Sequence, residues 1–436
     1  MRKVGIYTLG CKVSLYESEA IGEEFQRRGF EVAPFDSVCD VYVINTCTVT
    51  AESDAKSRKY IRRAIRKNPN AVVIAVGCYT QRSPDEALKI EGVSAVLGTA
   101  DKMKCVDIAE QLLSNSELQS PNFVTALEGA CFEQMCIESA PRTRAYVKIE
   151  DGCECKCTYC AISGARGPVR SKRPEDVIRE VEGLYENGTR EIVLTGIETG
   201  SYGADFDEKY DLADLLCELD RRGSCERVRL GSMAPELLSE RFITRVAHLK
   251  ILTPHFHVSM QSGSDNVLRR MKRRYSRAMA LDNIKRIKDL MPRVMLTADL
   301  MVGFPGETDE DFLDTMRFVR EAGLLDAHVF AYSKREGTPA ADYPDQVDER
   351  VKHERSAALI KECSDVREAV LSATVALGEL LRVIFETKKG GFYYGHSDSY
   401  IEVYAEGDGR CGDVAFVHPE RTESGAIYGK IINIDN

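Results

Sequence analysis

The stretch Cys153-Glu-Cys-Lys-Cys-Thr-Tyr-Cys160 is the part of the chain that decides how the rest is interpreted. Its cysteines Cys153, Cys157 and Cys160 have the spacing C-x3-C-x2-C. Three thiolates on one short loop can ligate three irons of a [4Fe–4S] cubane and leave the fourth iron open to an external ligand. Structural zinc takes four protein ligands, generally in two pairs, and no second C-x2-C or His pair follows at that distance. The spacing therefore favours an iron–sulfur cluster over zinc or a structural cysteine loop.

The same motif, with the aromatic residue Tyr159 before its last cysteine, resembles the signature of the radical S-adenosylmethionine (SAM) superfamily. The resemblance implies that the open iron binds the amino and carboxylate groups of SAM. It also implies that the reduced cluster splits SAM to form a 5′-deoxyadenosyl radical, so that Cys153, Cys157 and Cys160 are catalytic as well as metal-binding. Cys155 lies outside the pattern, and we expect its side chain to point away from the loop.

The composition is that of an ordinary globular protein with room for two to three domains in 436 residues. No apolar run approaches the roughly 18 residues of a membrane helix, and the N-terminus begins with a strand pattern instead of a signal peptide. Fifteen cysteines in such a chain indicate a reducing compartment and metal chemistry. We therefore expect a cytoplasmic protein without membrane contact. The net charge of −10 argues only weakly against nucleic acid as a partner.

Residues 1–113 alternate between strand and helix patterns, with buried strands at Val4–Leu9, Val41–Ile44 and Ala71–Val76. We predict an α/β fold that begins with a doubly wound parallel α/β domain. One cysteine follows each of these strands: Cys11, Cys47 and Cys78. Because ligands bind at the carboxyl edge of a parallel sheet, these three thiols form a candidate for a second cluster site.

The residues around these cysteines narrow the resemblance to the radical SAM methylthiotransferases. The matching segments are Thr8-Leu-Gly-Cys-Lys12, Asn45-Thr-Cys47 and Gly77-Cys78. The resemblance implies that Cys11, Cys47 and Cys78 ligate an auxiliary [4Fe–4S] cluster that carries the sulfur to be inserted. The Gly-Cys-Lys form is similar to the type that acts on N6-threonylcarbamoyladenosine in tRNA. Ser14 stands where most members have Asn.

The central part, residues 141–375, shows six strand–helix units and predicts a partial (β/α)6 TIM-type radical SAM barrel, open on one side. The expected strands are Tyr146–Ile149, Glu191–Leu194, Arg227–Leu230, Phe256–Met260, Leu296–Val302 and His328–Tyr332. The active site should lie at their carboxyl ends. Residues 114–140 carry Ser, Asn, Gln and Pro between short apolar pieces, and we predict a linker there.

Several strand ends match the methylthiotransferase pattern and supply candidate cofactor-binding residues: Tyr159, Thr195, Gly196, Gln261, Arg273, Gly303 and Tyr332. Gln261 can hydrogen-bond ribose hydroxyls, and the forked guanidinium of Arg273 suits a methionine carboxylate. Glycines such as Gly196 and Gly303 let the backbone approach a cofactor closely. The alternative for any one of these residues is a structural salt bridge.

Two basic runs suggest an RNA partner. Seven of the twelve residues from Lys56 to Lys67 are basic and none is acidic, a density of like charge that favours a polyanion over a merely solvated helix face. The second basic run comprises Arg269, Arg270, Lys272, Arg273, Arg274 and Arg277. We expect RNA contacts from Lys56, Lys59, Arg63 and Arg66 of the first run, and from Arg274 of the second.

Residues 376–436 have short β-rich runs with glycine turns, which predict a small antiparallel β-barrel. This tail resembles the TRAM domain, an OB-like RNA-binding module. Tyr394 is the candidate for stacking on a base, together with Phe392, Tyr393 and Tyr400, although all of these rings suit a barrel core equally well.

The resemblance as a whole implies an enzyme that inserts sulfur at C2 of an adenosine next to the tRNA anticodon and methylates it, with threonylcarbamoyladenosine as the preferred substrate. It implies two [4Fe–4S] clusters, SAM as methyl donor and radical source, the tRNA anticodon stem-loop, a flavodoxin- or ferredoxin-like electron donor and a sulfur source. Alternative substrates are isopentenyladenosine in tRNA and a ribosomal protein aspartate. An alternative of another class is a non-enzymatic iron–sulfur RNA-binding redox sensor.

Overall fold

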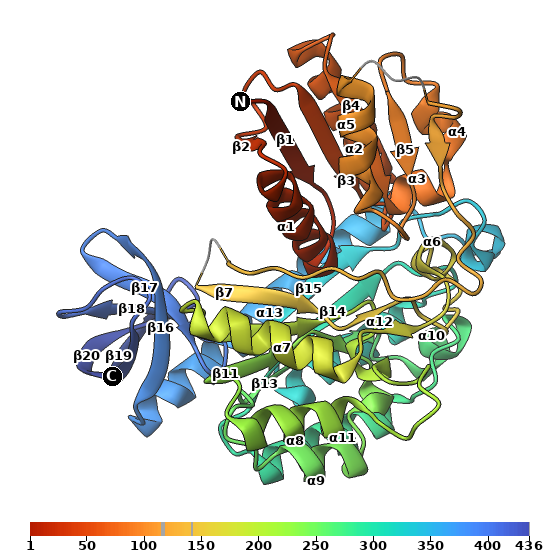
Figure 1. Ribbon diagram of the computed structural model, residues 1–436. Coiled ribbons are helices and arrows are strands. Elements are labelled where there is room, and N and C mark those ends of the chain that lie inside the picture. Colours follow the sequence, from red (N-terminus) through yellow and green to blue (C-terminus); the bar gives the residue numbers. More distant parts are fainter. Residues whose placement is uncertain (115–117, 141–142, 436) are drawn as a thin grey trace.

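Three structural units follow one another in the computed structural model, which describes residues 1–114, 118–140 and 143–435 (Figure 1). An N-terminal parallel sheet is followed by a partial barrel and then by a small closed β-barrel. The predicted fold class is confirmed. In the described residues, no helix has both the length and the apolar character to cross a membrane.

The N-terminal unit is one parallel six-stranded sheet in the order β2-β1-β3-β4-β5-β6. Its strands are β1 (Lys3–Thr8), β2 (Glu31–Ala33), β3 (Val41–Thr46), β4 (Val72–Gly77), β5 (Ala95–Leu97) and β6 (Asn122–Phe123). Its helices are α1 (Lys12–Arg27), α2 (Ala51–Lys67), α3 (Cys78–Arg82), α4 (Pro84–Leu88) and α5 (Lys104–Leu113). Every residue of β3 and β4 is buried, because helices cover both faces. Alternate residues of β3 pack with α1 and α5 on one face and with α2 on the other.

The segment predicted as a linker is only partly a linker, because β6 lies within it and extends the sheet by one strand. Its residues 115–117, and residues 141–142 at the predicted start of the barrel, lie outside the described residues.

The central unit consists of two parallel sheets, β11-β10-β7 and β12-β13-β14-β15, connected by one bridge between Val228 and Leu252. The strands are β7 (Arg144–Lys148), β10 (Glu191–Thr195), β11 (Arg227–Leu230), β12 (Ser232–Met233), β13 (His255–Gln261), β14 (Met295–Val302) and β15 (Asp326–Ala331). The larger helices are α7 (Pro174–Glu186), α8 (Leu212–Arg222), α9 (Glu240–Val246), α11 (Arg277–Leu290), α12 (Asp309–Ala322) and α13 (Glu349–Leu377). Shorter elements are β8 (Glu150–Asp151), β9 (Arg170–Ser171), α6 (Ile162–Arg166), α10 (Asp265–Arg270), η1 (Thr199–Ser201), η2 (Pro235–Leu237) and η3 (Pro339–Asp342). All six predicted strands are present, and one continuous apolar core lies between the strands and the helices.

The C-terminal unit is a closed barrel in the order β16-β17-β18-β20-β19. Its strands are β16 (Leu381–Lys389), β17 (Phe392–Ser397), β18 (Glu402–Glu406), β19 (Val414–Glu423) and β20 (Ala426–Asp435). All neighbouring pairs are antiparallel except β18 with β20. Leu325 and Leu371 of the central unit belong to its core, so the barrel is packed onto the end of α13.

A buried charge cluster joins the N-terminal unit to the central barrel. Glu17 of α1 is fully buried. It forms ion pairs with Lys102 at 2.5 Å, Lys148 at 2.9 Å and Arg166 at 2.7 Å. Lys148 and Arg166 also contact Asp151, at 2.6 and 3.1 Å. Burial by itself would raise the pKa of Glu17, but Arg166, Lys102 and Lys148 outweigh it and hold that pKa well below its usual range. Glu17 is therefore ionised, and it ties β7 and α6 of the barrel to α1.

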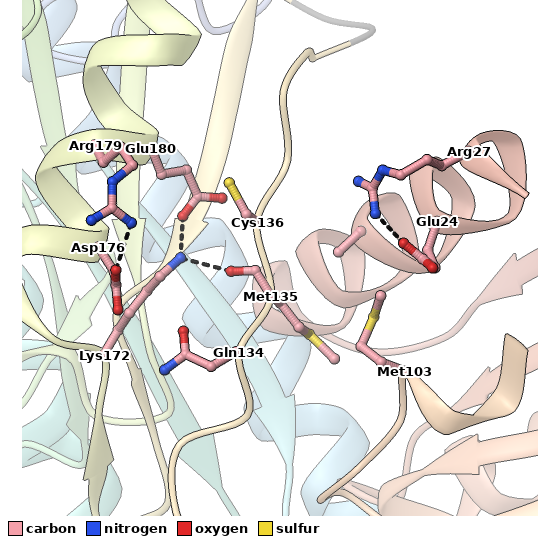
Figure 2. Close-up of a pocket in the computed structure, with 11 residues that line it drawn as sticks. Glu24, Arg27, Met103, Gln134, Met135, Cys136, Lys172, Asp176, Arg179 and Glu180 are labelled. Atoms are coloured by element: carbon pink, nitrogen blue, oxygen red, sulfur yellow. Dashed lines mark hydrogen bonds and ion pairs between the residues drawn. The ribbon is translucent and has the colours of Figure 1, made fainter. Parts of the chain in front are cut away.

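An extended segment also runs between the N-terminal unit and the central barrel, as Figure 2 shows. Residues 134–136 run between α1 and α7, beside a cavity of about 360 Å³. The Lys172 ammonium donates to the Met135 carbonyl oxygen at 2.7 Å and to Glu180. Tyr16 of α1 donates to the same carbonyl at 2.7 Å and to Glu180 at 3.0 Å. The segment thus links the two units through hydrogen bonds to both.

Replacing Glu17 with glutamine (E17Q) should lower the free energy of unfolding by about 3–5 kcal/mol, because three buried cations lose their shared counter-ion. Urea denaturation followed by circular dichroism measures the change. The matched control is E52Q, since Glu52 makes only an exposed pair with Lys56 at 2.8 Å, and its loss should barely move the midpoint. Equal midpoints for the two variants would contradict a stabilising role for the charge cluster.

Candidate functional site

The three strand-end cysteines of the N-terminal unit meet at the carboxyl edge of its sheet. Cys11 caps α1 after β1, Cys47 follows β3, and Cys78 begins α3 directly after β4. A Cβ atom at Gly10 would lie 3.3 Å from Cys47 Sγ, so the Cys11 turn touches Cys47. Burial, together with the nearby thiols of Cys78 and Cys11, raises the pKa of Cys47 to about 11. The three cysteines therefore lie near one another at this edge, and their role as cluster ligands stays a prediction.

Glycine is required where β4 turns into α3. Gly77 has φ +110°, and a Cβ atom there would lie 2.7 Å from both Asn45 Oδ1 and the Thr46 carbonyl oxygen. Only a residue without a side chain avoids both the left-handed strain and the clash. Gly77 thereby lets Cys78 lie against the neighbouring strand end.

Arg166 connects the charge cluster to this thiol group, because its Nε donates a hydrogen bond to Cys78 Sγ at 3.2 Å. Three buried cations (Lys102, Lys148, Arg166) here face two buried carboxylates (Glu17, Asp151). The positive surplus favours a thiolate at Cys78, against the burial that raises the pKa of this thiol.

The second cysteine group lies on the loop after β8, at the mouth of the barrel. Thr158 anchors the loop: its N–H donates to the Met271 carbonyl at 3.1 Å and its hydroxyl to the Arg270 carbonyl at 2.9 Å. Arg273 donates to Cys157 Sγ at 3.2 Å, and the Ile162 N–H donates to Cys160 Sγ at 3.4 Å. Cys153, Cys157 and Cys160 thus share one ordered loop.

Cys155 does not point away from this loop as expected. A hydrogen bond with Cys153 lowers the pKa of Cys155 to about 6, helped by the nearby charges of Arg273 and Arg274.

The donor sets of both thiol groups fit iron–sulfur clusters. Among the described residues, no three His, Cys, Asp or Glu side chains are arranged to hold a single metal ion. Each group instead presents thiols whose sulfur atoms accept N–H hydrogen bonds, on Cys78 in one and on Cys157 and Cys160 in the other. Such bonds to sulfur are an established way in which proteins stabilise and tune cluster thiolates.

Several predicted cofactor residues surround the Cys153–Cys160 loop. Tyr159 packs edge-on against Phe304, which also packs against Tyr332. The Tyr332 hydroxyl is buried and has no hydrogen-bond partner in the described part of the chain. Gln261 ends β13 at a register shift and has φ +66°, a strained conformation for a residue with a side chain. Backbone strain of this kind is concentrated at functional sites. The strained Gln261 and the unpartnered hydroxyl of Tyr332 therefore stay candidates for cofactor contacts.

Arg273 and the two glycines have structural partners that the sequence did not reveal. The Arg273 guanidinium donates hydrogen bonds to Cys157 Sγ, to the Ser259 carbonyl oxygen at 3.0 Å and to the Tyr275 hydroxyl at 3.0 Å. A Cβ atom at Gly196 would lie 2.4 Å from Glu150 Oε2, and one at Gly303 would lie 2.3 Å from Lys352 Cγ. Their assignment to SAM stays a prediction.

A cavity of about 530 Å³ lies where the N-terminal unit, the central barrel and the C-terminal barrel meet. Gly10, Cys11 and Lys12 line it from the N-terminal unit, and Thr195 and Gly196 from the end of β10. Inward-facing side chains of β13 and β14 line its wall, and residues of the C-terminal barrel complete it. His255 Nε2 and His257 Nδ1 contact Thr297 Oγ1 at 3.0 and 2.8 Å. The cavity therefore joins an auxiliary thiol to the barrel strands that carry the predicted SAM residues.

The predicted RNA residues lie outside this cavity. Lys56, Lys59 and Arg66 are exposed on α2, which begins just beyond Cys47, while Arg63 pairs with Asp36. Arg274 is exposed and donates to the Glu154 carbonyl at 3.3 Å, next to the cluster loop. Tyr394 is half-buried, lies 5.0 Å from the ring of Tyr404, and has Lys389 over its face.

The other tail aromatics divide into core and joint residues. Tyr393 is buried in the barrel core. Tyr400 is stacked between His255 and His396, at centroid distances of 4.5 and 4.9 Å, so it joins the C-terminal barrel to the central one.

Comparison with known proteins agrees with this arrangement. Residues 147–319 match the Radical SAM superfamily, and residues 3–98 match Uncharacterized protein family UPF0004. The chain is 41% identical over 415 residues to threonylcarbamoyladenosine tRNA methylthiotransferase MtaB of Bacillus subtilis, covering 93% of this chain and 91% of the relative. The chain belongs to the radical SAM methylthiotransferase family.

Other relatives are similar to the chain at lower identity. The tRNA-2-methylthio-N(6)-dimethylallyladenosine synthase of Pelotomaculum thermopropionicum is 34% identical over 417 residues, covering 94% of this chain and 92% of the relative. Among solved structures, the radical S-adenosylmethionine methyltransferase TsrM from Kitasatospora setae has a TM-score of 0.58 at 15% identity, covering 78% of this chain and 77% of that one. This last likeness shows the fold alone.

The methylthiotransferase site contains residues that the sequence reasoning missed: Lys12, Glu150, Arg166, Glu198, His255, His257, Thr297 and Asp299. Alternation along β13 and β14 already places His255 with His257, and Thr297 with Asp299, on one face. A polar face inside a barrel was the available signal for these four. The two buried glutamates had no comparable signal, because their burial depends on tertiary packing.

The pKa of Glu198 provides a test of the buried site. Burial raises this pKa to about 8, although the Ala234 N–H donates to Oε1 at 3.1 Å. An unfolded glutamate titrates near 4.3, so unfolding releases a proton between about pH 5 and pH 8. The free energy of unfolding should therefore fall as pH rises, by up to about 1.4 kcal/mol per pH unit from this group.

The variant E198Q should lose this contribution, since glutamine keeps the acceptor oxygen and does not titrate. Urea midpoints of both proteins are measured from pH 5 to pH 8. As pH rises, the midpoint of wild type should fall relative to the midpoint of E198Q. Parallel curves for the two proteins would show that Glu198 is already ionised at pH 5.

Proposed function

We propose that this chain is a tRNA methylthiotransferase that converts N6-threonylcarbamoyladenosine next to the anticodon to its 2-methylthio derivative. The observation that carries the proposal is the cavity of about 530 Å³, because Cys11 of one thiol group and Thr195–Gly196 at the barrel mouth line the same space. A sulfur-bearing site and a radical-forming site must face one substrate base. Identity favours the threonylcarbamoyl substrate: 41% to the Bacillus subtilis enzyme against 34% to the dimethylallyladenosine synthase.

The chemistry requires a radical, because C2 of adenosine carries an unactivated C–H bond that acid–base catalysis does not open. When bound, the [4Fe–4S] cluster with SAM at Cys153, Cys157 and Cys160 supplies this radical, and the auxiliary cluster at Cys11, Cys47 and Cys78 supplies the sulfur site. The family supports the first cluster, and its N-terminal domain is consistent with the second.

The side chains around the two thiol groups donate hydrogen bonds to sulfur and hold the two units in place. Arg273 and the Ile162 N–H donate to thiol sulfur on the barrel loop, and Arg166 donates to Cys78 in the auxiliary group. These donors stabilise negative charge on sulfur. The charge cluster around Glu17 holds the two groups in a fixed relation, since it belongs to both units. The substrate base then has to enter between them, splayed out of the anticodon loop.

The remaining partners follow from this chemistry. A flavodoxin- or ferredoxin-like electron donor would reduce the barrel cluster, and a sulfur source would restore the sulfur consumed in each turnover. A cytoplasmic location, where tRNA and reducing conditions are both found, is supported by fifteen cysteines without a disulfide framework.

Anaerobic reconstitution followed by iron counting and nucleoside mass spectrometry tests the proposal. Wild type should hold about eight irons per chain, four for each cubane, and should convert threonylcarbamoyladenosine in an anticodon stem-loop. C47A should lose about half the iron and all methylthiolation but still form 5′-deoxyadenosine. C411A is the matched control, because Cys411 is exposed in the C-terminal barrel and should be replaceable without effect.

Other outcomes would point to other functions. Product formation only with isopentenyladenosine RNA would change the substrate. About four irons in wild type, without SAM cleavage, would favour the redox sensor instead.

The basic face of α2 provides the test for RNA binding. The double variant K59E/R66E should weaken binding of the stem-loop and reduce the slope of log K against log salt by at least about 0.7 for each phosphate that these side chains neutralise in wild type. Filter binding at several salt concentrations measures both effects. R241E is the control, since Arg241 is an exposed arginine on α9 of the central unit. Equal weakening of RNA binding in the two proteins would remove α2 from the RNA surface.

A further inference from the structure

Lys12 is the feature of the cavity that the thiol groups leave unexplained. It is the first residue of α1, it lines the cavity beside Cys11, and its side chain makes no ion pair or hydrogen bond within the described residues. A cation is also disfavoured at the amino end of a helix, where the backbone dipole is positive. No carboxylate of the described residues forms an ion pair with it, although the charges of Asp299 and Glu191 act on it from farther away, against those of Arg229 and Arg144.

The carboxylates around the same cavity already have partners. Asp299 contacts His257 Nε2 at 3.2 Å and His328 Nδ1 at 3.8 Å. Asp326 and Glu402 both pair with Arg367, at 3.0 and 3.5 Å. Lys12 is thus a cation in a polar cavity whose carboxylates make their close contacts with other side chains, and such a charge is costly to keep unless a ligand anion meets it.

A second unpaired group points to a ligand in the same space. His255 is 3% exposed and lines the cavity, and its Nδ1 has no hydrogen-bond partner among the described residues. Ser232 and Thr297 add hydroxyl groups to the lining. The wall therefore suits a ligand with a carboxylate and further hydrogen-bonding groups, and it would be left unsatisfied by an apolar one.

We propose that Lys12 binds the carboxylate of the threonine moiety on N6 of the substrate adenosine, and so selects this substrate over adenosines with an apolar N6 substituent. The inference rests on the proposed function and deepens it. An isopentenyl group offers no anion and no hydrogen bonds, so it would leave both Lys12 and His255 unpaired in the bound state.

The experiment uses reconstituted holoenzyme and two synthetic anticodon stem-loops. One carries threonylcarbamoyladenosine, and the other carries the analogue in which the threonine carboxylate is a carboxamide. Wild type should prefer the carboxylate in kcat/KM by roughly 10- to 100-fold, the range for a hydrogen bond to a charged group. K12Q should lose the preference, with the two RNAs reacting equally, and K12R should restore most of it.

Two controls separate a specific contact from general effects. Iron content is measured in K12Q beside the kinetics, because Lys12 is adjacent to the predicted cluster ligand Cys11, and only protein with the wild-type iron content is compared. K59Q removes a cation outside the cavity and should lower kcat/KM for both RNAs by the same factor, leaving their ratio unchanged.

The inference and the proposed function fail in different ways. If wild type acts on the threonylcarbamoyl stem-loop but K12Q slows the carboxylate and carboxamide RNAs equally, Lys12 does not read the carboxylate. If wild type acts only on an isopentenyladenosine stem-loop, the proposed substrate is wrong. If K12Q lacks iron, K12R still decides, because retained preference in K12R with full iron supports the charge contact and an absent preference overturns it.

Discussion

The buried ion pairs of Glu17 are the interaction on which the arrangement of this molecule depends. A carboxylate on α1 can stay ionised at complete burial only because Lys102, Lys148 and Arg166 surround it. Lys148 and Arg166 belong to the barrel, so separating the two units would leave charge uncompensated in the interior. An apolar interface of the same size would tolerate sliding, whereas these directional contacts fix one orientation.

That orientation determines where chemistry can occur. Arg166 contacts Glu17 through one nitrogen and Cys78 through another, so the joint between the units is also a wall of the auxiliary thiol group. Cys11 and Lys12, at the start of the same helix α1 that carries Glu17, then face the barrel cavity. Fold stability and site geometry are therefore linked through a single helix, and this explains why charged residues occupy an interior position where apolar packing would be more usual.

The cavity itself shows a division between reaction and recognition. Cys11 and the strand end at Thr195 line one part of it, whereas Lys12, His255 and Thr297 supply the polar atoms that we propose to contact the substituent of the base. The C-terminal barrel contributes Tyr400, which stacks on His255 and closes the wall. The C-terminal barrel thus also shapes a pocket of the central unit.

By itself the sequence determined the three units, the six barrel strands and both cysteine groups, because periodicity and motif spacing are local properties of the chain. It could not determine that β6 extends the sheet, that Arg273 serves Cys157, or that Arg166 joins Glu17 to Cys78, since these contacts connect residues 26 to 149 positions apart. It also could not show that the Lys12 side chain has no ion-pair partner among the described residues. Only the tertiary structure decides which charges are buried together, because the cost of burying a charge depends on everything that surrounds it.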